Sequence, residues 1–417
     1  MRSRTLAGFT PTRYSLVTIR LAKRVQRIKP SPTLAVTARA ARLKAEGKDI
    51  IGLGAGEPDF DTPMHIADAG VAAIRAGHTR YTNVDGTNEL KDAIIGKFRH
   101  DNGLEYARNQ ILVSSGAKQT VFNLCCALLD PGDEAIIPAP YWVSYPDMVL
   151  IADGTPVHVP AGMDTGFKIT AAELEAAITR RTRLFILNSP SNPTGAAYSR
   201  AELEAFGRVL ARHPDVVVGT DDMYEHIWWG PEPFTSFATA NPGLYGRTVT
   251  INGCSKCYAM TGWRIGYCGG PAEIIAAMAT VQGQSTSNAS SISQKAATVA
   301  LNAPQDCVEE MNVAYMARHA LVVDGLNALP GIRCLPGWGT FYAFANVEQA
   351  MRLVGAVDDN AFAEFLINEA GVAVVPGSAF GAPGHVRLSF AASTDTLKDA
   401  LGRMQRALSG AKTKKRA

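Results

Sequence analysis

The chain has 417 residues, of which 47% are hydrophobic and 8% aromatic, enough for two domains with sizeable cores. No apolar run reaches the roughly 18 residues that a membrane-spanning helix needs. The first 45 residues hold 11 of the 41 basic residues and no acidic one, so the net charge of +3 arises from this N-terminal stretch. A nucleic-acid-binding surface would need basic residues on a folded, aromatic-containing face, and this stretch is not of that kind.

From about residue 65 the chain alternates helical and extended patterns. Helices are predicted over 65–76 and 88–100. Seven strand-like runs lie at 111–114, 134–138, 155–159, 184–187, 216–219, 248–251 and 265–268. Short strands that alternate with longer segments predict an α/β fold, in which helices cover a mainly parallel seven-stranded sheet.

After Pro304 the pattern changes to a long helix over 305–329, followed by strands at 332–335, 340–345, 372–375 and 386–390. This predicts a second, smaller α+β domain, which the residues before about 60 join. The predicted division is a flexible basic leader (1–26), an N-terminal segment joining the small domain (27–63), a large domain (64–304), a small domain (305–408) and a basic tail (409–417).

A turn of small residues separates the predicted strand 111–114 from the helix after it. Gly116, Ala117 and Lys118 open that helix. The first amides of a helix and the positive end of its dipole suit a phosphate group. A helix N-terminus without a ligand is the alternative.

Two more strand ends carry polar side chains, and open α/β sheets bind ligands at such ends. Asn192 lies in a rigid Pro-rich loop after the run 184–187, where its carboxamide can point at a ligand. Asp221 and Tyr224 follow the run 216–219, and a carboxylate there can keep a ring nitrogen protonated. The alternatives are an ordinary Asn-Pro turn and a turn with solvated acids.

Lys256 follows the run 248–251 among small and apolar residues. Loss of hydration disfavours its charged form, and a neutral amine is what imine formation with an aldehyde requires. Arg264, eight residues later, can hold a phosphate with two donors. Amine and phosphate clamp together indicate pyridoxal 5'-phosphate, which carries an aldehyde and a phosphate on one ring. A surface lysine after a strand is the alternative.

Arg387 lies in the predicted strand 386–390. A transaminase binds an amino acid and a 2-oxo acid in turn, and a permanently charged, bidentate arginine suits the carboxylate that both carry. A strand arginine paired at the surface is the alternative for this residue alone.

Together these segments resemble the class I/II aminotransferases, enzymes of the fold type I that use pyridoxal phosphate. The resemblance runs from Arg27 to Leu408 and is closest to the bacterial aspartate/prephenate subgroup. Its most specific stretches are Lys29-Pro-Ser-Pro-Thr33, Gly54-Ala-Gly-Glu-Pro-Asp-Phe-Asp-Thr-Pro63, Pro140-Tyr-Trp142-Val-Ser-Tyr, Asn192-Pro-Thr-Gly195, Thr261-Gly-Trp-Arg264 and Arg387-Leu-Ser-Phe.

The resemblance implies catalytic roles for Lys256, Asp221 and Tyr224. Lys256 would attach the cofactor and move the proton, and Asp221 would pair with the ring nitrogen. The other implied cofactor contacts are Asn192 and Tyr224 at the phenolic oxygen, Trp142 on the ring face, Gly116, Ala117, Lys118 and Arg264 around the phosphate, and Tyr81 at the phosphate of the neighbouring subunit.

For the substrate, the resemblance implies that Arg387 binds the α-carboxylate, helped by Asn192 and the Gly56 backbone, with Trp142 beside them. Lys29, Thr33 and Lys118 match the positions for a distal carboxylate. The implied protein is a homodimer with shared active sites. The implied reaction moves an amino group between aspartate or glutamate and 2-oxo acids such as 2-oxoglutarate or prephenate.

Three alternatives stay open at this point. An aromatic or kynurenine-type aminotransferase and a carbon–sulfur lyase would use the same scaffold, since fold does not settle reaction type. A non-catalytic regulatory module that binds pyridoxal phosphate would need a DNA-binding domain, for which the leader is too short. The leader itself is interpreted as an unstructured extension or a start-site artefact in preference to an organelle transit peptide, because the resemblance is to bacterial enzymes.

Seven scattered cysteines predict reduced thiols and a cytoplasmic protein. Cys254 and Cys257 have the spacing of a metal or redox pair, but no second pair exists and the eight histidines show no ligand spacing, so no metal is expected. Cys257 also places an oxidisable thiol beside Lys256.

Overall fold

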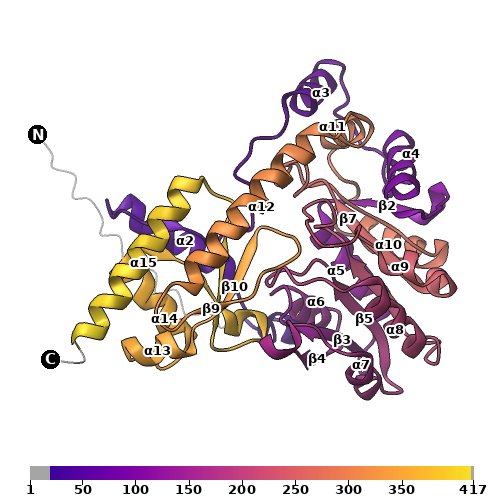
Figure 1. Ribbon diagram of the computed structural model, residues 1–417. Helices are drawn as coiled ribbons and strands as arrows, with labels where there is room; N and C mark the ends of the chain where they lie inside the picture. Colours follow the sequence, from indigo (N-terminus) through magenta and orange to yellow (C-terminus); the bar gives the residue numbers. More distant parts are fainter. Residues whose placement is uncertain (1–18, 415–417) are drawn as a thin grey trace, which may run out of the picture.

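The computed structural model describes residues 19–414, and its main element is a seven-stranded sheet of order β2-β8-β7-β6-β5-β3-β4 (Figure 1). Its strands are β2 (Ile111–Ser114), β3 (Glu134–Ala139), β4 (Thr155–Pro160), β5 (Thr182–Asn188), β6 (Val217–Asp221), β7 (Thr248–Gly253) and β8 (Gly266–Gly269). Only β8 runs antiparallel to its neighbours. The predicted mainly parallel sheet is therefore confirmed.

Helices cover this sheet, so its central strands are buried on both faces and consist of continuous apolar runs. These helices are α3 (Met64–Arg75), α4 (Asn88–Lys97), α5 (Ala117–Leu128), α6 (Tyr145–Ile151), α7 (Ala171–Ala177), α8 (Arg200–Leu210), α9 (Phe237–Ala240), α10 (Ala272–Gly283) and α11 (Ser291–Asn302). Local sequence fixes the start of α8, where Ser199 and Glu202 cap the N-terminus reciprocally.

A second group of elements lies to the left in Figure 1 and is built on the four-stranded antiparallel sheet β12-β13-β10-β9. Its strands are β9 (Arg333–Cys334), β10 (Tyr342–Asn346), β12 (Val375–Pro376) and β13 (His385–Ser389). Its helices are α12 (Asp306–Asn327), α13 (Glu348–Val354), α14 (Asp359–Phe365) and α15 (Thr394–Lys414).

The N-terminal segment packs on this second group. The short strand β1 (Ile51–Gly52) pairs in parallel with β11 (Val372–Ala373), and the helix α2 (Pro32–Ala45) packs its Ala40 and Leu43 against Ile367 and Ala373. A short helix, α1 (Lys23–Gln26), precedes α2, and Arg24 there pairs with Asp153 of the large sheet region at 3.3 Å. Most of the predicted leader lies outside the described residues.

Two predicted elements are wrong in detail. The run 372–375 is not one strand, because β11 pairs with β1 and β12 with β13, in two different sheets. The predicted helix 88–100 ends as an α-helix at Lys97 and continues as a π-helical turn to Asn102, which the left-handed Gly103 terminates. Within residues 19–414, no helix is long and apolar enough to cross a membrane.

Candidate active site

A cavity of about 270 Å³ opens where the carboxyl ends of β5, β6 and β7 face β13 and the N-terminal segment. It brings together most of the site residues predicted from the sequence. Those that line it are Thr33, Gly56, Ala117, Lys118, Trp142, Asn192, Asp221, Tyr224, Lys256, Arg264 and Arg387. Gly116, Lys29 and Tyr81 are predicted residues that do not line it.

Lys256 lies three residues beyond the end of β7, half-buried on the cavity wall. Its Nζ donates to the backbone oxygen of Gly56 at 2.6 Å, which ties the strand end to the N-terminal segment. Desolvation, reinforced by the nearby cations Arg264 and Arg387, lowers the pKa of Lys256 to about 8. The amine is therefore much closer to its neutral, nucleophilic form at physiological pH than an exposed lysine is.

Asp221 ends β6 and its carboxylate is buried. The Tyr145 hydroxyl donates to its Oδ2 at 2.6 Å, and the Met223 amide donates to its Oδ1 at 3.3 Å. Burial raises the pKa of Asp221, while these hydrogen bonds and Lys256 oppose the rise. A cationic ring nitrogen beside this carboxylate would compensate the desolvation.

The guanidinium of Arg387 is the largest of the buried cations and is only 1% exposed. It donates to Asn192 Oδ1 at 2.8 Å and to the Gly54 backbone oxygen at 2.7 Å, and it lies between the rings of Tyr342 and Phe380. Among residues 19–414 no carboxylate pairs with it. A buried cation without an acidic partner fits an anionic ligand, since an unpaired buried charge is costly.

Gly116 and Arg264 lie against each other at the N-terminus of α5. Gly116 has a φ of 84°, and a Cβ there would lie 2.0 Å from Arg264 Nη2, so only glycine fits. Arg264 itself has a φ of 56°, a conformation that a non-glycine residue adopts rarely and often at functional sites. Partial burial and Arg264 lower the pKa of Lys118, whose ammonium lies 5.0 Å from the centre of the Trp142 ring. This arrangement fits a phosphate group.

The loop after β5 is held by two asparagines. The backbone N–H of Asn192 donates to Asn188 Oδ1 at 2.8 Å, and Asn188 Nδ2 donates to the backbone oxygen of Asp221 at 2.8 Å. Since the side-chain oxygen Oδ1 of Asn192 already accepts from Arg387, the side-chain nitrogen Nδ2 is left to donate to a ligand. Asn188 lines the cavity as well.

The remaining predicted residues lie at or beyond the cavity edge. Thr33, in α2, lines the cavity, whereas the exposed Lys29 lines a neighbouring groove that it shares with Lys118 and Arg264. Tyr81 is 91% exposed and lies outside the cavity of its own chain. Its predicted contact with the neighbouring subunit stays a prediction.

Nine residues that line the cavity were not predicted, among them Tyr145, Asn188 and Tyr342. Tyr145 has a local signal, because it stands three residues after Trp142 and packs edge-on against that ring, with centroids 5.2 Å apart. Asn188 is the last residue of β5, just as Asp221 is the last residue of β6. Tyr342 has no such signal, since it belongs to a distant strand.

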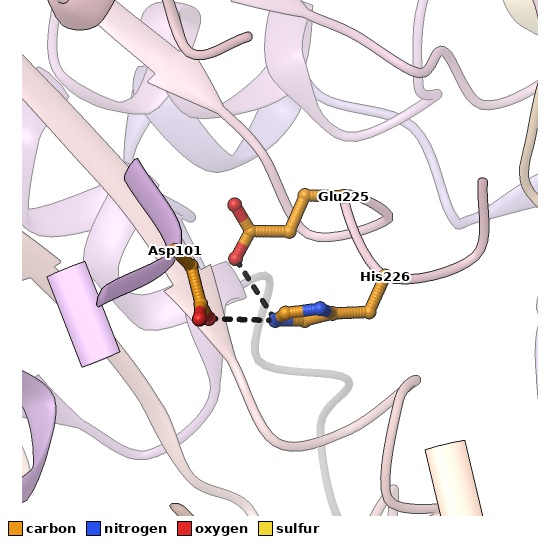
Figure 2. A group of neighbouring side chains, drawn as sticks. All are labelled: Asp101, Glu225 and His226. Carbon is orange, nitrogen blue, oxygen red and sulfur yellow. Dashed lines mark ion pairs between the residues drawn. The ribbon is translucent and has the colours of Figure 1, made fainter. Parts of the chain in front are cut away.

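A separate group of charged side chains surrounds the buried Glu225. His226 Nε2 lies 3.3 Å from Asp101 Oδ2 and 3.2 Å from Glu225 Oε1 (Figure 2), a geometry compatible with a metal ion. The Lys97 ammonium, however, contacts Glu225 and lies 3.7 Å from Asp101, so it already supplies positive charge to these carboxylates. The expectation that the protein holds no metal stays a prediction.

The seven cysteines are all free. Burial raises the pKa of Cys254 to about 12 and that of Cys257 well above its ordinary value. The Cys257 thiol faces the Gly253 backbone oxygen at 3.7 Å. A buried, protonated thiol is poorly reactive, which argues against the oxidisable thiol expected beside Lys256.

The model of the family described as aminotransferase class I and II matches residues 48–404. The chain belongs to this family. It is 57% identical to the aspartate/prephenate aminotransferase of Nitrosomonas europaea, over 94% of this chain and 100% of that protein. It is 54% identical to the aspartate/prephenate aminotransferase of Cereibacter sphaeroides, over 92% of this chain and 98% of that protein.

Solved structures of aminotransferases have the same fold. The aspartate aminotransferase from Rhizobium meliloti matches with a TM-score of 0.90 and 51% identity, over 94% of this chain and 99% of that one. The Thermus thermophilus aspartate aminotransferase with maleate matches with a TM-score of 0.88 and 43% identity, over 94% and 100% of the two chains. The fold predicted by resemblance is therefore confirmed.

Class I/II aminotransferases depend on pyridoxal phosphate, so this chain is a pyridoxal-phosphate-dependent transaminase. The residues of the cavity fit that cofactor. Lys256 offers an amine with a lowered pKa, the buried Asp221 offers a carboxylate, and the absence of a Cβ at Gly116 lets the Arg264 guanidinium lie against the N-terminus of α5.

Proposed function

We propose that this aminotransferase moves an amino group between aspartate or glutamate and 2-oxo acids, with 2-oxoglutarate and prephenate among them. The observation that carries the proposal is the buried guanidinium of Arg387, which faces the same cavity as Lys256 and lacks an acidic partner among the described residues. The relatives are named aspartate/prephenate and aspartate aminotransferases, which supports the substrate class.

Each side chain has a role that follows from its position. When bound, pyridoxal phosphate supplies an aldehyde and an electron-withdrawing ring. Arg387 and Asn192 would bind the α-carboxylate, and Asp221 would hold a proton on the ring nitrogen. Lys256 Nζ, whose pKa is lowered to about 8, would take the proton from the substrate's α-carbon in its neutral form and deliver it again.

The remaining cofactor contacts would fix the ring. Tyr224 and the Asn192 amide would donate to the phenolic oxygen, and Trp142 would lie on the ring face. Gly116, Ala117, Lys118 and Arg264 would hold the phosphate. Because Lys256 is tied to the Gly56 backbone, the N-terminal segment would help to exclude water from the reacting atoms.

A second carboxylate would meet Lys118, Lys29 and Thr33 at the cavity edge. Lys29→Ala, assayed with saturating cofactor, should lower kcat/KM for aspartate, 2-oxoglutarate and prephenate about threefold to tenfold, the size of a partly exposed charge contact. Alanine and phenylalanine, which lack that carboxylate, should be affected much less. An equal loss on both groups of substrates would contradict the distal-carboxylate role.

We also propose a homodimer with shared active sites, located in the cytoplasm. The exposed Tyr81 supports sharing because it has no cavity of its own to enter, and the seven free cysteines fit a reducing compartment. Subunit exchange between Tyr81→Phe and Lys256→Ala proteins creates hybrids with one site that keeps both native residues. Activity above that of both parents is expected, and a mixture no more active than its parents would contradict sharing.

A further inference from the structure

Tyr342 is a buried tyrosine of β10 that contacts both Tyr224 and Arg387 in the cavity. Its hydroxyl lies 3.0 Å from the Tyr224 hydroxyl, and its ring lies 4.3 Å from the guanidinium carbon of Arg387. A Cβ on Gly56 would come within 2.6 Å of the Tyr342 oxygen, so the glycine leaves the space that this side chain fills. Tyr342 is 2% exposed and lines the cavity.

The two hydroxyls can share only one hydrogen bond, and the direction of that bond matters. If Tyr224 donates to a ligand in the cavity, its oxygen must accept the proton of Tyr342. Within residues 19–414, Tyr224 is the hydrogen-bond partner recorded for the Tyr342 hydroxyl. Burial raises the pKa of both tyrosines, so both keep their protons. Donation into Tyr224 then strengthens its own donation to the ligand, because successive hydrogen bonds polarise one another.

We propose that Tyr342 is a positioning residue that couples the two binding functions of this site: its hydroxyl orients Tyr224 toward the phenolic oxygen of the cofactor, and its ring holds the guanidinium of Arg387 in place for the substrate carboxylate. This inference rests on the proposed function, in which Tyr224 and Arg387 have those roles. The hydroxyl of Tyr342 acts on Tyr224 and its ring acts on Arg387, so substitutions that remove only the hydroxyl or the whole ring can separate the two roles.

Tyr342→Phe removes the hydroxyl and keeps the ring. When bound, the cofactor absorbs visible light, and its absorbance changes with pH. The pH midpoint of that absorbance change should rise by about 0.5 to 1 unit, because the anionic phenolic oxygen of the cofactor loses stabilisation equivalent to one hydrogen bond. The loss in kcat/KM should lie in kcat, with KM nearly unchanged for every substrate. Tyr315→Phe is the matched control, since Tyr315 is equally buried beside Phe341, at 5.4 Å between ring centroids, but does not line the cavity.

Tyr342→Leu removes the ring as well. It should reproduce the spectral shift and in addition raise KM about threefold to tenfold for all substrates, because Arg387 loses one aromatic face. A double-mutant cycle sharpens the test: in a Tyr224→Phe background, Tyr342→Phe should no longer move the titration midpoint.

The outcomes separate this inference from the function beneath it. A Tyr342→Phe midpoint equal to that of the wild type and of Tyr315→Phe would overturn the coupling through Tyr224, as would a full shift in the Tyr224→Phe background. A wild-type protein that transfers no amino group between aspartate or glutamate and 2-oxoglutarate would overturn the proposed function, while the midpoint titration would still decide the coupling through Tyr224.

Discussion

Two groups of charged side chains, one in the cavity and one around Glu225, are built in opposite ways. In the cavity, Arg387 and Lys256 are cations that no carboxylate pairs with among the described residues. Beyond Tyr224, the carboxylate of Glu225 accepts from Lys97, from Asn102 at 2.8 Å and from Asn252 at 2.7 Å, with His226 beside it. The first group is incomplete without a ligand, whereas the second is complete in itself.

The complete group also holds the incomplete one in place. Glu225 belongs to the loop that follows Asp221, and Asn252 belongs to β7, which leads to Lys256. Their hydrogen bond fixes the distance between the strand ends that carry the carboxylate and the amine. In this protein the cations without a carboxylate partner are the candidate ligand-binding residues, and the fully hydrogen-bonded Glu225 positions them.

Lys256→Ala should have the largest effect on activity. Transamination should fall by at least about 10²- to 10⁴-fold, since both the attachment of the cofactor and the proton transfer are lost. The thermal midpoint should change little. Borohydride reduction of the wild-type protein, followed by peptide mapping, should place the label on Lys256, with Lys398→Ala as an exposed control. Label on another lysine would break the assignment.

Glu225→Gln should have the largest effect on stability. Removing the carboxylate leaves Lys97 and His226 buried without full compensation, and breaking a buried pair costs about 3–5 kcal/mol. Urea unfolding of the holoenzyme measures this loss, and Glu310→Gln, an exposed glutamate, is the control. If Glu225→Gln unfolded like the wild type but raised KM instead, the distinction between the two groups would be wrong.

The same group predicts a pH dependence of stability. Burial opposes protonation of His226, but Glu225 and Asp101 outweigh it and raise its pKa to about 9. The stabilisation is therefore fully present below about pH 6.5, the ordinary value, and is lost as the pH rises through about 9. The free energy of unfolding should fall by about 2–3 kcal/mol over that window. His226→Gln should flatten the curve, while His65→Gln, an exposed histidine, should not.

Arg387→Lys should reduce activity without a comparable loss of stability. An ammonium lacks the planar fork, so hydrogen bonds worth about 1.5–3 kcal/mol are lost and kcat/KM falls about tenfold to a hundredfold. The loss should be the same for every amino and 2-oxo acid, because all carry the α-carboxylate. A loss confined to dicarboxylic substrates would move Arg387 to the distal carboxylate. Arg406→Lys is an exposed control.

The sequence alone was sufficient for the sheet and for the residues at its strand ends. Each of the seven apolar runs became a strand, and Asn192, Asp221 and Lys256 stand just after such runs. These features are local: an apolar run and the first polar residue beyond it are visible within about ten residues. The sites that were carried by a resemblance, such as Tyr81 and Thr33, depended on motifs rather than on such patterns.

Only the tertiary structure decided which distant side chains meet. Tyr145 bonds to Asp221 from 76 positions away, Tyr342 meets Tyr224 across 118, and Lys97 reaches Glu225 across 128. The split of the run 372–375 has the same origin, since its two halves are apolar alike and only their pairing partners differ. Hydrogen bonds and strand pairing are set by spatial proximity after folding, which a single chain's local pattern does not encode.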